Sequence, residues 1–370
     1  MAAFDFLDSF YLDHHTRREL VRELDGVLAA HRLTARVLPF YSYEHPAIWL
    51  PRYGRPLLAE SVAETAEGVW QFERTAPGYP SDDEAALRDR HFFIYEHEAY
   101  AGVYVLITVA DSHFFLDLCR TVERRYPNTV TTFVKHQRLL RLLTEFRERC
   151  GIAQLTITKA SHRARHGVDE RTGESHVIPS VSWPKMGLEE AFQWLYDQNG
   201  WFQTIEFTAR REHTGQARIS LGRRGVVRTT GLFPEVFSCF VEPICKLIHE
   251  NVGLFSGRSR RDRPDLSVRP LVIDFGVDQL REPDERRRLI GAMRRLKTAS
   301  ISVLHGNPYV HLCVSDYYDG SVFDVWVLSP REVTIVPQMK GTYQAIERLI
   351  HHIFDTYAEG HIKEYEGRAA

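Results

Sequence analysis

Asp111, Ser112 and His113 follow directly after an apolar stretch over 103–110 and include two potential metal ligands. A carboxylate and an imidazole at the end of a strand can share one divalent metal ion, as metal-dependent phosphoesterases require. Further ligands at a recognisable spacing are missing from the sequence. A helix cap explains the same residues, because Asp or Ser before a helix accepts hydrogen bonds from its free N–H groups. We favour the cap and predict no metal; a hydrolase using Asp111 and His113 is the alternative.

Nucleophilic chemistry has no recognisable signature in this chain. The sequence contains neither a Gly-x-Ser-x-Gly elbow nor a Gly-x-x-x-x-Gly-Lys-Ser/Thr phosphate loop. Its five cysteines include no Cys-x-x-Cys pair, which argues against a zinc knuckle and a disulfide framework. Cys239 and Cys245 lie in a segment with helical apolar spacing, so we interpret them as packing groups. We therefore expect no cofactor and favour a protein that is not an enzyme.

Positive charge is concentrated in one part of the chain. The whole chain holds 47 Lys and Arg against 49 Asp and Glu, but residues 201–300 hold 19 against 12. Arginine makes planar, bidentate contacts with phosphate groups and stays charged at any physiological pH. We expect a polyanion-binding face built from a turn, a loop and a helix, comprising Arg223, Arg224, Arg258, Arg260, Arg261, Arg263, Arg287, Arg288, Arg294 and Arg295.

This arginine set leads to the hypothesis of a non-catalytic binding protein whose partner is a nucleic acid or an acidic protein. Aromatic residues at strand ends of the same half would let single-stranded nucleic acid stack. Two alternatives stay open: the arginines pair with acids of this chain or of another subunit in a homo- or hetero-oligomer, or they are a solvated face. Exposed strand edges would also suit a scaffold subunit of a multi-protein assembly.

Length and composition limit how these residues are positioned. With 370 residues, 44% apolar and 26% charged, the chain is typical of a globular protein and long for a single core. The apolar stretch over 102–110 is about half of the ~20 residues that a membrane helix needs. Asp5, Asp8 and Asp13 stand where an export signal carries basic residues. We expect a cytoplasmic protein that does not enter a membrane.

The spacing of apolar residues predicts an α+β fold of mainly antiparallel sheets with flanking helices. One helix is expected to follow Thr16, because Thr16 and Glu19 have the spacing of a capping box. Further helices are predicted over 114–125 and 130–149. The stretch over 37–80 is rich in proline and aromatic residues, and we interpret it as an irregular wrap over the core.

Changes in pattern divide the chain into three regions, with the polar, turn-rich stretch over 168–184 as the best boundary. Because such stretches lie exposed between compact parts, a boundary there is physically plausible. The regions are residues 1–88 (N-terminal helix and wrap), 89–180 (a first α/β unit) and 181–370 (a C-terminal α+β region).

Within the C-terminal region, the order strand-strand-strand-helix is predicted twice, over 201–251 and 309–358. In the alignment of the two units, Ile219 and Leu221 of the first correspond to Trp326 and Leu328 of the second. Each unit alone would leave one sheet face uncovered, so we expect the two to pack on other elements. A true duplication is a hypothesis, since few aligned residues are identical and antiparallel sheets converge on such patterns.

Overall fold

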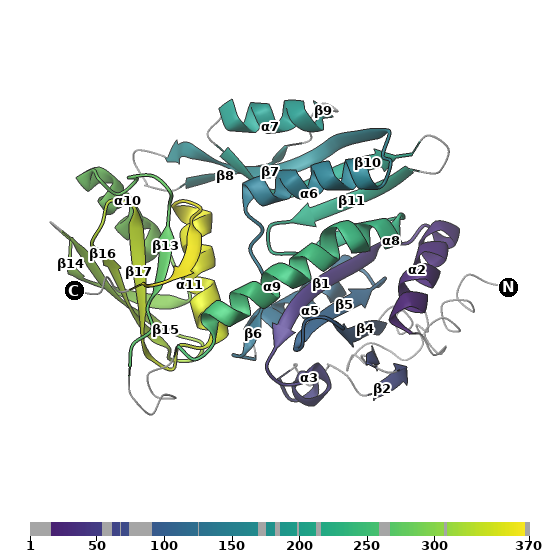
Figure 1. Cartoon of the computed structure of the whole chain (residues 1–370), viewed down its shortest axis with the longest axis horizontal. Helices are drawn as coiled ribbons and strands as arrows, with labels where there is room; N and C mark the ends of the chain where they lie inside the picture. Colours follow the sequence, from purple (N-terminus) through teal and green to yellow (C-terminus); the bar gives the residue numbers. More distant parts are fainter. Residues whose placement is uncertain are drawn as a thin grey trace. The chain divides into compact units, whose positions relative to one another are not determined.

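The computed structural model describes residues 16–53, 61–66, 68–73, 91–124, 126–168, 175–181, 186–197, 200–211, 216–258, 267–306 and 309–366. These residues form two antiparallel sheets with flanking helices, which confirms the predicted α+β class (Figure 1). The chain divides into two compact units, Met1–His249 and Glu250–Ala370. In the described ranges, every helix is too short or too polar to cross a bilayer.

The first unit contains the larger sheet and most of the helices. Its helices are α2 (Arg17–His31), α3 (Pro46–Tyr53), α5 (Ser112–Arg124), α6 (His136–Arg149), α7 (Leu188–Asp197) and α8 (Phe233–Val236), followed without a break by the π-helical segment η1 (Phe237–Val241) and by α9 (Glu242–Phe255), within which the unit ends at His249. Its strands are β1 (Ala35–Ser42), β2 (Ser61–Ala66), β3 (Val69–Glu73), β4 (His91–Glu96), β5 (Val103–Thr108), β6 (Thr129–Val130), β7 (Gln154–Val168), β8 (Ser175–Val181), β9 (Met186–Gly187), β10 (Gly200–Arg210), β11 (Gln216–Gly222) and β12 (Val227–Thr229).

Strand β1 lies in the middle of the larger sheet, although most of it falls in the stretch expected to be an irregular wrap. The main path of the sheet runs β2-β3-β4-β5-β1-β12-β11-β10-β7-β8. On one edge of β1, pairing with β12 stops at Val37 and pairing with β6 begins at Tyr41. Pro39 lies between these two pairings, where that edge carries no ladder, and a strand tolerates proline at such a position. The stretch over 37–80 is therefore more regular than its prolines indicated.

Helices begin close to where their sequence signals predicted. Thr16 caps α2 in a capping box: its hydroxyl accepts a hydrogen bond from the Glu19 N–H, and its own N–H donates to the Glu19 carboxylate over 3.0 Å. The helix predicted over 130–149 begins only at residue 136, because Thr129 and Val130 form β6 and pair with β1. The Thr129 hydroxyl donates to the carbonyl of Val122 at the end of α5, which fixes this short strand.

Aromatic side chains fasten the helices of the first unit to its sheet. On one face, Phe115 of α5 and Trp49 of α3 belong to a buried cluster with side chains of β1, β3, β4 and β5. Phe146 of α6 packs against Phe207 of β10 and Phe240 of η1, with ring centroids 6.2 and 4.9 Å apart. The end of α6 is thereby held against the π-helical segment.

The division between the two units falls within α9, whereas the sequence favoured the turn-rich stretch over 168–184 as a boundary. Strands β7 and β8, which flank part of that stretch, pair with each other, for example at Ala160 and Val181. The described part of the stretch therefore belongs to the sheet of the first unit.

The described part of the second unit contains a six-stranded sheet, two helices and the end of α9. Its strands are β13 (Leu271–Asp274), β14 (Ala299–His305), β15 (Val310–Asp316), β16 (Val322–Val327), β17 (Glu332–Met339) and β18 (His361–Glu364), in the order β14-β15-β16-β17-β13-β18, and its helices are α10 (Pro283–Arg294) and α11 (Tyr343–Thr356). Every second residue of β15, β16 and β17 is buried, as expected for a sheet with one face on a core. Ile346, Ile350 and Ile353 of α11 are buried, as their helical spacing predicted.

The predicted order strand-strand-strand-helix is present in both places. Strands β10, β11 and β12 are neighbours and precede α8, while β15, β16 and β17 are neighbours and precede α11. The aligned apolar positions nevertheless differ, because Leu221 is fully buried and Leu328 is 71% exposed. In β16 the buried residues are Phe323, Val325 and Val327, so Trp326 faces the other side of the sheet. The alignment of Trp326 and Leu328 with buried residues of the first unit is therefore wrong by one position.

Candidate functional site

Four aromatic side chains come together on the face of the C-terminal sheet opposite its buried positions. His305 ends β14 and pairs with His311 of β15, which in turn pairs with Trp326 of β16. Tyr309 directly precedes β15 and is 39% exposed. We call His305, Tyr309, His311 and Trp326 the aromatic row. Each ring of the aromatic row contacts at least one other ring of the row.

A register shift brings His305 into the aromatic row. Ile301 and Val303 of β14 pair with buried residues of β15, but the ladder then skips one residue, so that His305 faces His311. Such an irregularity re-aims a side chain to the other side of a sheet, and it is common at sheet edges next to functional sites. Because β14 is an edge strand, this end of the row lies at the border of the sheet.

The rings of the aromatic row lie nearly parallel. The centroids of His311 and Trp326 are 3.5 Å apart with an interplanar angle of 14°. His305 and Tyr309 are 4.2 Å apart at 22°, and Tyr309 and Trp326 are 6.1 Å apart at 25°. Planar aromatic ligands, such as nucleic-acid bases, stack on ring faces, and here they could use only the faces that the neighbouring rings leave uncovered.

The carboxylate beside the aromatic row is occupied by neighbours. One oxygen of Asp324 lies 3.3 Å from Nε2 of His311, and the other accepts a hydrogen bond of 2.7 Å from the amide of Gln338. Burial, followed by the charge of Asp324, raises the pKa of the Cys313 thiol in the neighbouring strand. One oxygen of Asp324 therefore has a hydrogen bond, from Gln338, while the other lies near the imidazole of His311 without a hydrogen bond from Nε2.

Exposed cations lie at the other end of β14. Arg294 at the end of α10 and Lys297 in the following turn are exposed, and Arg295 is half-buried. Strand β14 then runs seven residues to His305, roughly 20 Å at the usual rise of a strand. Ser300 and Ser302 are exposed along it. An extended ligand on this edge could contact both the cations and the aromatic row.

Two predicted arginines of α10 are exposed but already paired. Arg287 contacts Asp284 over 2.5 Å, and Arg288 contacts Glu285 over 2.6 Å, each one turn away on the same helix. Ion pairs this exposed contribute roughly 0–1 kcal/mol, so an anionic ligand could displace them at low energetic cost.

Two other predicted arginines are buried and stabilise the fold. Arg223 is 1% exposed, and its guanidinium lies 3.9 Å from the centre of the Phe133 ring. Arg258 is 2% exposed and donates to the carbonyls of Leu254 and Arg269 and to the carboxylate of Glu364. Neither side chain offers an exposed surface for a polyanion.

The rest of the predicted set belongs to different units or lies outside the described residues. Arg224 lies in the first unit, 3.5 Å from Glu123, whereas the α10 arginines belong to the second unit. Arg260, Arg261 and Arg263 lie outside the described residues. The positive block over 201–300 is therefore divided between the two units.

Asp111 acts as the helix cap that the sequence favoured. Its Oδ1 accepts hydrogen bonds from the N–H groups of His113 and Phe114, over 2.6 and 3.0 Å, at the first turn of α5. Among the residues that the structure describes, no group of three or more His, Cys, Asp or Glu side chains could hold a metal ion. Among the described residues, no further side chain thus joins Asp111 and His113 as a metal ligand.

A second cluster of ionisable groups, in the first unit, is satisfied internally. Nε2 of His97 lies 2.6 Å from Glu242, and Nδ1 accepts a hydrogen bond from the Ala99 N–H. The other oxygen of Glu242 accepts from Arg17, and this contact and that with His97 hold the pKa of Glu242 below its usual value against the effect of burial. Because both ring nitrogens of His97 are engaged, the imidazole cannot also serve a substrate.

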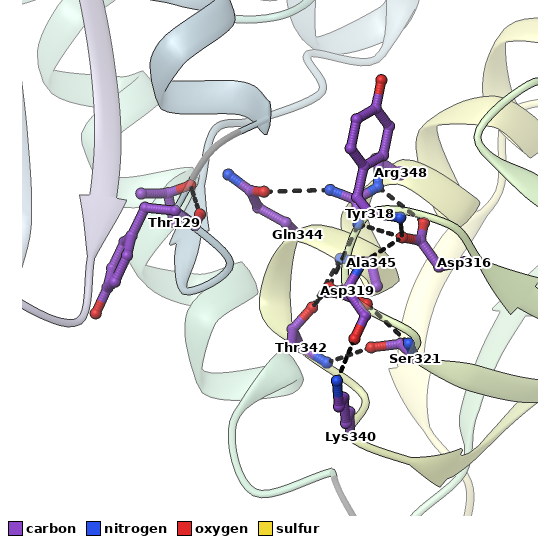
Figure 2. A network of polar contacts seen from close by, with 11 residues as sticks. Thr129, Asp316, Tyr318, Asp319, Ser321, Lys340, Thr342, Gln344, Ala345 and Arg348 are labelled. Atoms are coloured by element: carbon purple, nitrogen blue, oxygen red, sulfur yellow. Dashed lines mark hydrogen bonds and ion pairs between the residues drawn. The ribbon is translucent and has the colours of Figure 1, made fainter. Parts of the chain in front are cut away.

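A third cluster joins the β15–β16 turn to the start of α11 (Figure 2). Arg348 donates to both oxygens of Asp316, over 3.0 and 2.8 Å, and Nη1 donates to Gln344. The Asp319 carboxylate accepts from the hydroxyl of Thr342, the N-cap of α11. These partners are contained within one unit and mutually satisfied, so the cluster positions α11 on the sheet rather than binding a ligand.

The aromatic row was missed because the spacing of apolar residues assigned Trp326 to the buried face. The signal was present in β15 and β16, where His311 and Trp326 alternate with the buried aliphatic residues. No protein-family model matches this chain, and the search of curated proteins gave no significant match either.

Proposed function

We propose that this protein is a non-catalytic binding protein that takes single-stranded nucleic acid on the aromatic row of its C-terminal unit. The observation that carries the proposal is the parallel stack of His305, Tyr309, His311 and Trp326 on one sheet face. Bases have π faces that stack on such rings whatever their sequence, and each stacked base contributes about 1–3 kcal/mol. Duplexes hide these faces, so a single strand is the better ligand.

Charge at the start of β14 supports the same ligand. Arg294 and Lys297 are exposed there, and Arg287 and Arg288 of the preceding helix form ion pairs with Asp284 and Glu285. A strand whose bases stack on the aromatic row would pass its phosphates toward these cations along β14. The revised site keeps the α10 arginines of the predicted set and leaves out the buried Arg223 and Arg258.

Fluorescence anisotropy with a labelled oligo-dT or oligo-U of about 12 nucleotides tests the proposal. Trp326→Ala and Tyr309→Ala should each weaken binding by about 5- to 150-fold, which corresponds to the loss of one stacked base. Tyr317→Ala is the matched control, because Tyr317 is 67% exposed, lies beyond the other end of β15 and is not part of the aromatic row. It should leave affinity unchanged.

The salt dependence of binding distinguishes the contribution of the cations from that of the aromatic row. Arg294→Ala should reduce the slope of log K against log salt by about 0.7, as expected for the loss of one phosphate contact on a single strand, and Trp326→Ala should leave that slope unchanged. Absence of binding at about 50 mM salt would refute the proposal. Binding that Arg294→Ala weakens while Trp326→Ala and Tyr309→Ala leave it intact would refute stacking and indicate that the oligonucleotide binds through its phosphates alone.

A further inference from the structure

We infer that Cys150 and Cys239 form a site of reversible oxidation that reacts with low-molecular-weight disulfides. The two Sγ atoms lie 3.4 Å apart, although the residues are 89 positions apart in the sequence. A disulfide bond is about 2.0 Å long, so the sulfurs must approach by little more than 1 Å. Both thiols are free in the structure.

Local structure holds the two thiols together. Cys150 is the C-cap residue of α6, and Cys239 lies in the π-helical segment η1. The carbonyl of Cys150 accepts a hydrogen bond from Nε of Arg211, whose Nη2 donates to Glu235 on α8, one turn before Cys239. The ring contact between Phe146 and Phe240 connects the same two helical segments. Such positioning replaces a bimolecular step by an intramolecular one.

Exposure determines which of the two cysteines reacts first. Cys150 is half-buried and Cys239 is 2% exposed, so a small disulfide RSSR reaches Cys150 first. The Cys150 thiolate attacks one sulfur of RSSR, which forms Cys150–S–SR and releases RS⁻. The Cys239 thiolate then attacks the Cys150 sulfur, which closes the protein disulfide and releases a second RS⁻. The two thiol protons pass to the two RS⁻ groups, so two protein thiols are oxidised and RSSR is reduced to two RSH.

The pKa of the Cys150 thiol, which attacks RSSR, sets the rate of the first step. Burial, and then the neighbouring Cys239, raise the pKa of Cys150 to about 12. The thiolate is therefore scarce at neutral pH, and the rate should rise about tenfold for each pH unit between about 7 and 9. The product closes a loop of 89 residues and fastens η1 to the end of α6.

Oxidised glutathione is the probe for the full-length protein. After incubation at about pH 8.5, the denatured wild type should have lost two of its five titratable thiols, and peptide mass spectrometry should find Cys150 joined to Cys239. Dithiothreitol should restore both thiols. Cys239→Ser should instead accumulate glutathione on Cys150, and Cys150→Ser should lose no thiol. Cys313→Ser is the control and should still form the bond.

Three results would overturn the inference. They are an unchanged thiol count in the wild type, a lasting glutathione adduct on Cys150 although Cys239 is present, and a cross-link that joins other cysteines or two chains. A rate that does not change with pH would contradict attack by the Cys150 thiolate. All of these readouts are independent of nucleic-acid binding.

Discussion

Removal of the Arg348 side chain should weaken the second unit far more than removal of an exposed arginine. The Arg348 and Asp316 side chains are 13% and 4% exposed, and their bidentate contact joins α11 to the β15–β16 turn (Figure 2). Arg348→Ala leaves the Asp316 carboxylate buried with only the N–H groups of Tyr318 and Asp319 as partners. Loss of one partner from a buried ion pair costs about 3–5 kcal/mol.

Hydrogen exchange measured by mass spectrometry reports this loss in the second unit alone. For amides that exchange through opening of the whole unit, 3–5 kcal/mol corresponds to exchange faster by about two to four orders of magnitude in β15–β17. Arg287→Ala is the control, because the Arg287–Asp284 pair on α10 is 76% and 79% exposed and contributes roughly 0–1 kcal/mol. Similar acceleration of exchange in both variants would show that the buried Arg348–Asp316 contact does not link α11 to the turn.

Two further predictions concern the first unit. Burial, followed by the charge of Arg223, lowers the pKa of His136 to about 4 from 6.5, so the unfolded chain binds the proton first as pH falls. The contribution of His136 to the free energy of unfolding is therefore complete above about pH 6.5 and falls by about 1 kcal/mol per pH unit down to about pH 4. Urea unfolding should show this slope in the wild type. Persistence of the slope in His136→Gln would contradict its assignment to His136. Gly225 has φ of +75°, and an added Cβ would lie 2.8 Å from the Thr132 methyl group, so Gly225→Ala should cost about 2–4 kcal/mol. Gly151→Ala, with φ of +59° and open space, should cost only about 1–2 kcal/mol. Urea unfolding of both glycine variants measures these losses, and equal losses would contradict the steric argument.

Local sequence patterns predicted a helix correctly where the interactions that stabilise it are between residues close in the sequence. The capping box at Thr16 and Glu19 predicted the start of α2, and the spacing of Ile346, Ile350 and Ile353 predicted the buried side of α11. Strand β1 escaped prediction because Pro39 normally argues against a strand, and the gap between its two partner strands exists only in the assembled sheet.

The sequence revealed the excess of arginine over 201–300 but not which of these arginines are exposed. The excess of arginine over 201–300 was correctly counted, but a guanidinium has two stabilising uses, on the surface and in the interior. Arg223 lies against an aromatic ring, and Arg258 satisfies buried carbonyls. Phe133 lies far from Arg223 in the sequence, so the run of charges could not reveal that Arg223 is buried.

The aromatic row shows how much depends on one residue of register. On a strand, successive side chains point to opposite faces, so a shift of one position exchanges the buried and the exposed sets. Trp326 was aligned with a buried aliphatic residue because tryptophan counts as apolar, yet Phe323, Val325 and Val327 fill the buried face without it. When other residues of a strand already fill its buried face, a large aromatic residue between them lies on the opposite face. Core packing does not explain its presence there. Stacking on His311 supplies part of that reason, and the proposed ligand would supply the remainder.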